Sequence, residues 1–197
     1  MASSTNGVGS MVRDNGNLYD GDWAQTYSDA SFPETIEGPV TLEVAQSKEN
    51  ENKFYYNPSR PWHWCRIPYK DLWNSGTEKN PVKAEYDPCP DGWRVPTYAE
   101  LKELNDIYFT WITNEDGQSG CWFSEKNSYA ESVPHIFLPA AGFRSGHNGS
   151  DGYRGHDGFY WSSKSDDDGI NYIVLGNPYG LYDLNTANGY SVRCVQE

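Results

Sequence analysis

The sequence predicts an α+β domain with few helices, short antiparallel strands and long loops. Three observations support this class. One stretch alone, beginning at Thr97, carries clear signals of a helix start, several short apolar or aromatic runs resemble strands, and Gly, Asn, Asp and Ser fill the segments between them. At 197 residues, the chain has the length of one domain with room for an additional segment.

The predicted helix begins with a capping box. Thr97 and Glu100 have the T-x-x-E spacing, in which the Thr97 hydroxyl accepts from the Glu100 amide and the Glu100 carboxylate accepts from the Thr97 amide. Leu101, Leu104 and Tyr108 follow at helical spacing. We therefore expect a helix of about ten residues here.

The predicted strands are short runs bounded by turn residues. The first alternates apolar and polar residues, as half-buried strands do, and most of the others are rich in aromatic and β-branched residues. They cover residues 40–44, 53–56, 110–112, 120–123, 135–138, 160–161, 172–175 and 190–195.

The charge excludes several classes of partner. The chain has 28 Asp and Glu residues against 15 Lys and Arg residues, for a net charge of -13. This argues against nucleic-acid binding and against anionic membrane surfaces, and no apolar run reaches the roughly 20 residues of a membrane span. Only 37% of the residues are hydrophobic, but 15% are aromatic, which favours a folded chain over a disordered one.

The first 35 residues form a predicted N-terminal arm or tail. They are rich in Gly, Asn, Asp and Ser, and they lack the apolar segment of a signal peptide. The acidic residues Asp14, Asp20 and Asp22 lack the spacing of an EF-hand loop, so solvated turns are the better interpretation. A second methionine, Met11, leaves the natural start of the protein open.

The cysteines and tryptophans leave alternatives open. Four cysteines without a C-x-x-C pair argue against structural zinc, and they allow either two disulfides, in three connectivities, or free buried thiols. Residues 62–64 and 72–73 cluster aromatic rings that either form a sugar-stacking platform or, as is more common, fill the core. His63 among them fits a packed, hydrogen-bonded ring better than a catalytic base.

Residues 144–190 have a different composition from the rest of the chain. Most of them are Gly, Asn, Asp, Ser, Tyr or His, and strand-like segments interrupt them, which indicates loops displayed on a framework. Neither a collagen repeat nor a phosphate-binding loop fits this segment. Because Tyr, Ser, Gly and Asn on loops are typical of antibody binding surfaces, the composition favours binding over catalysis.

Four sequence blocks resemble a known family. In chain order they are DPCPDGWRVPT at 87–97, LPAAGFR at 138–144, YWSS at 160–163 and GYSVRCV at 189–195. The set resembles the paralogous C-type-lectin-like domains of Bacteroidetes and Fibrobacter surface proteins, especially the variable proteins of diversity-generating retroelements. In that family a retroelement mutates adenines in codons near the 3′ end of the gene, and the resulting residue types match those of 144–190.

The resemblance implies a C-type lectin fold over residues 36–197, with a variable region at about 144–190. It implies a disulfide between Cys89 and Cys194, because the last strand of that fold returns beside the start of the domain. It assigns Gly149, Gly155 and Gly158 to framework turns. The implied ligand-binding residues are Ser145, His147, Ser150, Tyr153, His156, Phe159, Asp166, Asp168, Asn171, Tyr172, Asn177, Tyr179, Tyr182 and Asp183.

Two departures narrow the expected function. The EPN, QPD and WND motifs of calcium-dependent lectins are absent, and the run 166–168 is an acidic loop more readily than a cation site. The fold is shared with formylglycine-generating enzymes, but Cys194 lacks the neighbouring cysteine that their chemistry needs. We expect no enzyme activity, metal or cofactor. A carboxylate-based hydrolase is a further hypothesis, and its one support is the abundance of acidic residues beside aromatic ones.

The leading hypothesis is a binding protein with a diversified surface that contacts a protein or glycan receptor of another cell or host. It would act outside the cell, on a cell surface or on a virion such as a phage tail. The alternative is a carbohydrate-binding lectin or pilus-tip adhesin of fixed specificity, which the many Trp and Tyr residues favour.

Overall fold

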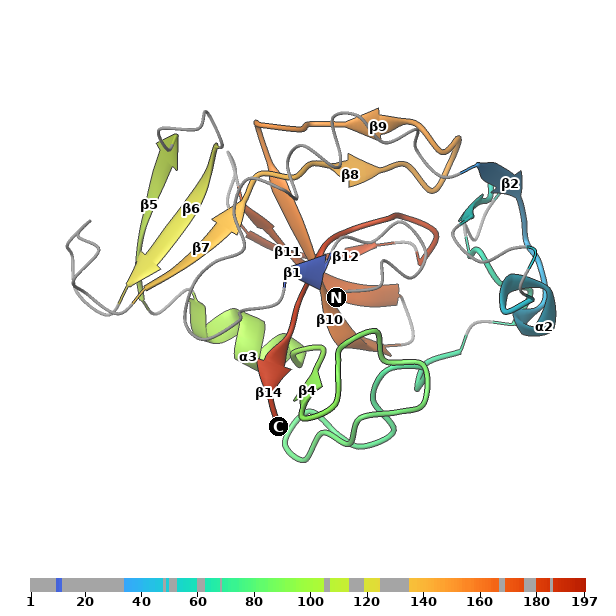
Figure 1. Ribbon diagram of the computed structural model, residues 1–197, viewed down its shortest axis with the longest axis horizontal. Helices are drawn as coiled ribbons and strands as arrows, with labels where there is room; N and C mark the ends of the chain where they lie inside the picture. The colour runs from blue at the N-terminus through green and yellow to red at the C-terminus, as the bar shows by residue number, and fades with distance from the viewer. Residues whose placement is uncertain are drawn as a thin grey trace.

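The computed structural model has an α+β fold with two short helices and many short strands in small sheets, among the residues it describes (Figure 1). These are residues 10–11, 34–47, 49, 53–59, 63–67, 69–104, 107–113, 119–124, 135–166, 169–175, 180–184 and 186–197. For 10–11, 164–166, 169–174 and 180–184, only the backbone is described. Within this part of the chain, no helix is long and apolar enough to cross a membrane.

A three-stranded antiparallel sheet forms the left-hand end of the molecule in Figure 1. It consists of β5 (Tyr108–Thr113), β6 (Ser119–Ser124) and β7 (His135–Pro139), in that order. The strands predicted at 110–112, 120–123 and 135–138 are confirmed. β6 is buried along most of its length because it lies between its two neighbours, whereas β5 lies at the edge and is mostly exposed.

A second antiparallel sheet contains the predicted strands at 160–161 and 172–175. Its order is β10 (Gly158–Asp166), β11 (Gly169–Leu175) and β12 (Gly180–Leu184). The register between β10 and β11 shifts between Trp161 and Ser165. Tyr160 and Leu175 are buried here and pack with Leu101 of a helix and Phe123 and Leu138 of the first sheet, which joins the two sheets through one core cluster.

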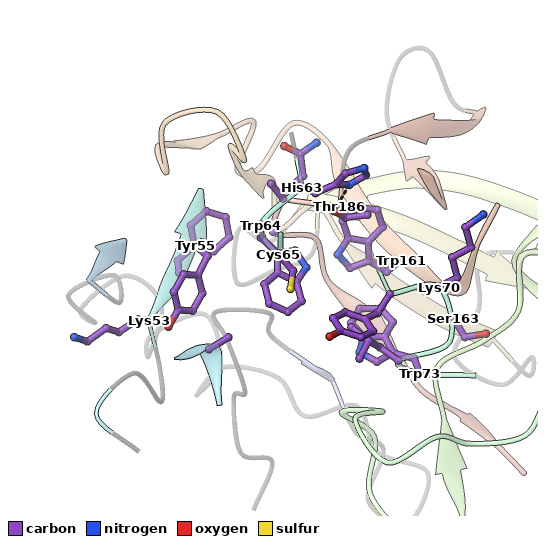
Figure 2. A pocket seen from close by; sticks show the side chains of 17 residues that line it. Lys53, Tyr55, His63, Trp64, Cys65, Lys70, Trp73, Trp161, Ser163 and Thr186 are labelled. Atoms are coloured by element: carbon purple, nitrogen blue, oxygen red, sulfur yellow. Dashed lines mark hydrogen bonds between the residues drawn. The ribbon is translucent and has the colours of Figure 1, made fainter. Parts of the chain in front are cut away.

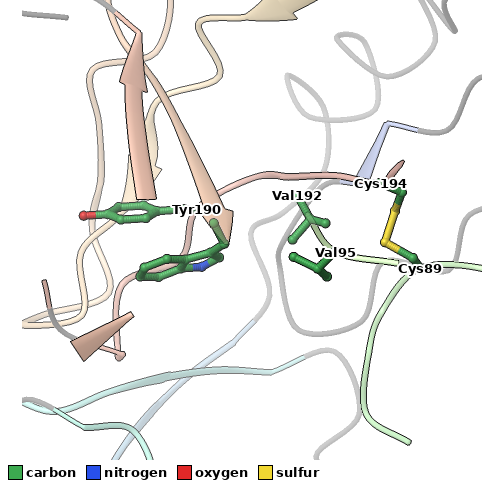
Figure 3. Packing of buried hydrophobic residues seen from close by; sticks show 6 residues of the cluster. Cys89, Val95, Tyr190, Val192 and Cys194 are labelled. Carbon is green, nitrogen blue, oxygen red and sulfur yellow. A yellow bond between two sulfur atoms is a disulfide. The ribbon is translucent and has the colours of Figure 1, made fainter. Parts of the chain in front are cut away.

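The end of the chain returns beside residues 89–95. β14 (Val195–Gln196) pairs antiparallel with β4 (Trp93–Arg94), and a disulfide joins Cys89 to Cys194, the pair that the resemblance implies. Figure 3 shows this disulfide beside Val95 and Val192. The strand predicted at 190–195 is divided into β13 (Val192–Arg193) and β14, and β13 pairs with β1 (Ser10–Met11) within the predicted N-terminal arm.

The four sequence blocks are connected by backbone hydrogen bonds. The Ser163 amide donates to the Pro96 carbonyl over 2.7 Å, and the Trp161 amide donates to the Ser191 carbonyl over 2.9 Å. Arg144 and Gly189 exchange two bonds of 2.8 Å. Segments that are far apart in the sequence therefore meet through main-chain contacts that fix their relative positions.

Helix α3 (Tyr98–Glu103) has the predicted capping box. Thr97 accepts from the Glu100 amide over 3.2 Å, and the Glu100 carboxylate accepts from the Thr97 amide over 2.8 Å. Glu100 also receives two bonds from Arg94, of 2.6 and 2.8 Å. The expected length was wrong: the helix ends at Glu103, and Tyr108 begins β5, where pairing with β6 outweighs the helical spacing.

The strand predicted at 40–44 is also wrong. Residues Leu42–Ala45 form a short helix, α2, with Thr41 as its N-cap. Only Val40 pairs, in a single bridge to Cys65. Alternation over five residues fits one helical turn as well as a strand, and the hydroxyl of Thr41, which accepts from the Val44 amide, favours the helix.

Two further strand pairs, one parallel and one antiparallel, complete the described elements. The strand predicted at 53–56 is confirmed as β3 (Phe54–Tyr56), which pairs in parallel with β2 (Thr35–Glu37). β8 (Phe143–Arg144) pairs antiparallel with β9 (Asp151–Gly152) along the top of Figure 1. The turn between β8 and β9 carries the first of the implied binding residues.

Candidate functional site

The first displayed turn, residues 145–150, is closed by its own main chain. The Ser145 amide donates to the Ser150 carbonyl over 2.7 Å, and the Gly149 amide donates to the Ser145 carbonyl over 2.8 Å. Gly149 has φ +73°, a conformation that glycine adopts without strain. His147 and Ser150 are exposed, and Ser145 is half-buried. The turn therefore has a fixed backbone with exposed side chains.

Buried groups attach this turn to the framework. The Arg144 Nε donates to the Gly149 carbonyl over 3.0 Å, and its guanidinium lies 5.0 Å from the centre of the Phe54 ring. The Gly146 amide donates to Asn188 Oδ1 over 2.8 Å, and the Gly146 carbonyl accepts from the Asn57 amide over 2.7 Å. These contacts reach β3 and the segment after β12, so the turn has little freedom to move.

The second displayed turn, residues 153–156, follows β9. The Asp157 and His156 amides donate to the Tyr153 carbonyl over 2.9 and 3.0 Å, and the Gly155 amide donates to the Ala140 carbonyl over 2.7 Å. Tyr153 has φ +61°, which is unusual for a residue with a bulky side chain, and 59% of its surface is exposed. His156 is exposed beside it, and Gly155 has φ +76°.

The other implied binding residues have different settings. Phe159 is half-buried: its ring stacks on Tyr190 at 5.1 Å and meets the edge of Phe143 at 5.0 Å, so it packs on the core cluster beneath the turns. Gly158 begins β10 and lies in a strand, not in a turn.

The remaining residues of the set lie in the β10–β11–β12 sheet or outside the described residues. Asn171 pairs with Asp183, and Tyr172 pairs with both Trp161 and Tyr182, in the backbone register. Asp166 pairs with Gly169 at the end of β10. Asp168, Asn177 and Tyr179 lie outside the described residues.

An open groove of about 740 Å³ runs between the second turn and the edge strand β5. Tyr153, His156 and Asp157 line one side, and Phe109 and Trp111 line the other. Cys121 also lines it, and burial raises the pKa of its thiol to about 12, so this thiol stays protonated at neutral pH.

The groove residues that the sequence did not assign to a binding site include the aromatics Phe109 and Trp111. Trp111 lies in the strand predicted at 110–112 and Phe109 directly precedes it, and their residue types are also those of core aromatics. The one weak signal is a pair of large aromatics on either side of Thr110, which would place both rings on one face of a strand. Whether that face is covered depends on the position of the strand in its sheet.

A second hollow, about 130 Å³ in volume, lies under the aromatic cluster predicted at 62–73. Trp64, Trp73 and Trp161 line it, and Figure 2 shows His63 and Thr186 together above Trp161. The His63 Nδ1 and Thr186 Oγ1 atoms are 2.8 Å apart, and burial lowers the pKa of His63. The ring is thus packed and hydrogen-bonded, as expected, and Trp73 also packs on the core.

The lining of this hollow is free of carboxylates among the described residues, although the chain as a whole is acidic. Its size is close to that of a protein cavity that holds one benzene ring. It therefore suits a single six-membered ring that stacks on an indole.

No metal site is found among the described residues, because no three His, Cys, Asp or Glu side chains lie close enough together. The two cysteines outside the disulfide, Cys65 and Cys121, are free and buried.

Comparison of the chain with protein-family models, with curated proteins and with solved structures finds no match.

Proposed function

We propose that this chain is a ligand-binding protein that presents a diversified surface on a C-type lectin-like scaffold. The observation that carries the proposal is the pair of turns at 145–150 and 153–156. Their backbones are fixed by main-chain hydrogen bonds, while His147, Tyr153 and His156 are exposed. Side chains on such turns can change without loss of the fold, which is what a diversified surface requires.

The positions of the four sequence blocks support the lectin-like scaffold. The blocks contact one another through backbone bonds from Ser163 to Pro96 and from Trp161 to Ser191. The turns begin directly after the second block, at Arg144. Conserving the blocks while varying the segments between them would therefore preserve the core.

The backbone of Tyr153 supports a binding role for the second turn. A tyrosine at positive φ costs free energy that Gly or Asn would avoid, and such strain concentrates at functional sites. Its ring stacks on Phe143 at 5.7 Å and borders the groove beside β5. Tyrosine offers a large amphipathic contact area at low entropic cost.

The experiment for diversification is sequencing of the DNA that flanks the gene. We expect a reverse-transcriptase gene and a nearby template repeat that matches the codons of 144–190 except at adenines. A flank that lacks both would remove diversification from the proposal. A selection of random peptides against the chain, followed by Tyr153→Ala and His156→Ala, tests binding by the turns.

A second candidate function is carbohydrate binding of fixed specificity, and the hollow lined by Trp64, Trp73 and Trp161 favours it. Aromatic rings beside polar groups such as Thr186 are suited to the two faces of a sugar ring. A glycan array tests this: we expect one sugar class to bind, with binding abolished by Trp64→Ala and retained by Tyr153→Ala. An array without any bound glycan would eliminate this candidate.

Either function places the protein where it meets a receptor on another cell or host, outside the cell, on a surface or on a virion. The negative charge favours receptors that are neutral or basic where they touch the turns.

A further inference from the structure

Strand β5 lies at the edge of its sheet in the described part of the chain. Among the described residues, its only strand neighbour is β6, and every residue from Tyr108 to Thr113 is exposed except Ile112, which is half-buried. Its six residues pair with β6 in one unbroken register. Natural proteins usually blunt such an edge with Lys, Pro, a bulge or a covering segment, and β5 contains neither a charge, a proline nor a bulge.

One face of β5 carries Phe109 and Trp111, which are partly exposed beside buried residues of β6. In the register of the sheet, Phe109 lies opposite Phe123 and Trp111 lies opposite Cys121, and both of those partners are buried in the core. Phe109 and Trp111 themselves remain 46% and 39% exposed. Their exposed surface forms one wall of the groove, opposite Tyr153.

We propose that this groove binds an extended segment of a protein partner, which adds as a fourth strand to the β5 edge. Alternate residues of β5 direct their N–H and C=O groups away from β6, toward an added strand. Apolar side chains of the segment would contact Phe109, Trp111 and Tyr153. This inference deepens the proposed function and rests on it, because Tyr153 and His156 of the second turn form the opposite wall.

Charge indicates the chemistry of the partner segment. Among the described residues that line the groove, Asp157 is the one acidic side chain, and the whole chain carries a net charge of -13. A segment with Lys or Arg among its apolar residues is attracted to this surface. Two copies of the chain, by contrast, repel each other, so pairing of β5 with β5 of a second copy is disfavoured.

The test is a selection of random peptides, displayed on phage, against the full chain. We expect enriched sequences with alternating apolar residues and at least one Lys or Arg. Trp111→Ala and Tyr153→Ala should each weaken a selected peptide by about tenfold or more, as for buried aromatic contacts at interfaces. Asp157→Asn should weaken it less and reduce the salt dependence of its affinity.

A matched control lies on the same strand. Tyr108→Ala removes a side chain that is 56% exposed on the opposite face of β5, so it should leave the affinity within about twofold. Circular dichroism and thermal unfolding confirm that the variants compared are folded.

The backbone pairing is tested on the peptide, which leaves the protein unchanged. N-methylation at alternate residues in one register should abolish binding, because those N–H groups pair with β5, and N-methylation in the other register should have little effect. Equal tolerance of both registers overturns strand addition. A selection that enriches no peptide also overturns the inference. So does sedimentation that shows a dimer which Thr110→Lys converts to a monomer, because β5 would then pair with a second copy of the chain.

The two proposals fail in different ways. If Tyr153→Ala and His156→Ala abolish binding while Trp111→Ala and N-methylation do not, the turns bind but β5 does not, and only the further inference fails. If Tyr153→Ala and His156→Ala also leave the affinity for the selected peptides unchanged, binding by the turns fails too.

Discussion

The framework around residues 87–104 and the two displayed turns satisfy their backbone groups in different ways. In the framework, side chains do this work: both oxygens of the buried Asp87 carboxylate accept, from the Cys89 and Val95 amides, over 2.8 and 2.9 Å. In the turns, main-chain bonds close each loop, and in the first turn Ser145 Oγ and Asn148 Oδ1 also accept from the His147 and Ser150 amides, over 3.2 and 3.1 Å. Substitution of Asp87 therefore removes a hydrogen-bond partner of the framework, whereas substitution of His147 or His156 changes only the exposed surface.

The largest expected effect comes from the disulfide that closes the framework. Cys89 and Cys194 are separated by 105 residues, so breaking the bond releases a long loop in the unfolded chain. We expect the double variant Cys89→Ala/Cys194→Ala to lose roughly 3–5 kcal/mol of unfolding free energy, measured by urea denaturation. Dithiothreitol should destabilise the wild type to a similar extent and leave the double variant unaffected; equal sensitivity of both proteins would contradict this.

The next effect concerns the cap of α3 and depends on pH. Glu100 accepts from Arg94 and from Thr97, and these bonds hold its pKa below the ordinary value of 4.5. Its stabilising contribution is therefore complete above pH 4.5 and is lost as the pH falls through the lower, folded-state pKa. We expect Glu100→Gln to cost about 1–2 kcal/mol at pH 7 and progressively less toward pH 3.

Comparing the stability of wild type and Glu100→Gln across pH separates the contribution of Glu100 from that of Asp87. Burial raises the pKa of Asp87, so its contribution changes in the opposite sense: stability falls as the pH rises through its folded-state pKa. The Asp87 effect is present in both proteins, so the difference between them reports the Glu100 contribution. A cost that stays constant from pH 7 to pH 3 would show that the carboxylate charge does not stabilise the cap.

A smaller effect is expected in the second turn, at Tyr153. The variants Tyr153→Gly and Tyr153→Ala both remove the ring, and they differ only in the Cβ atom, which is strained at φ +61°. Tyr153→Gly should therefore be more stable than Tyr153→Ala by about 1 kcal/mol, in thermal or urea unfolding. Equal stabilities would mean that the turn relaxes to negative φ once the ring is gone.

Local features of the framework could be predicted from the sequence, because each depends on residues close together in the chain. The capping box at Thr97 and Glu100 is one such feature, and the short strands are another. The alternation at 40–44 misled because five residues do not distinguish a strand from one capped helical turn. The pairing of Cys89 with Cys194 came from the resemblance, since spacing alone allows three connectivities.

The groove could not be predicted, because it depends on which strand lies at the edge of a sheet. The pattern at Phe109 and Trp111 is that of a half-buried strand in either position. In the described part of the chain β5 pairs with β6 and with no second strand, and the turn at Tyr153 lines the same groove. Both are long-range consequences of the fold, and none of the four sequence blocks gives a local sign of either.

The smallest expected effect tests whether the turns are truly separate from the framework. His147→Ala and His156→Ala change exposed side chains, so each should alter the unfolding free energy by less than about 0.5 kcal/mol. Arg144→Ala, one residue before the first turn, should instead cost about 2 kcal/mol or more, because Arg144 donates to the Gly149 carbonyl and packs on Phe54. If the histidine variants cost as much as Arg144→Ala, the turns share the packing of the core, and a surface that varies without loss of the fold is not available at these positions.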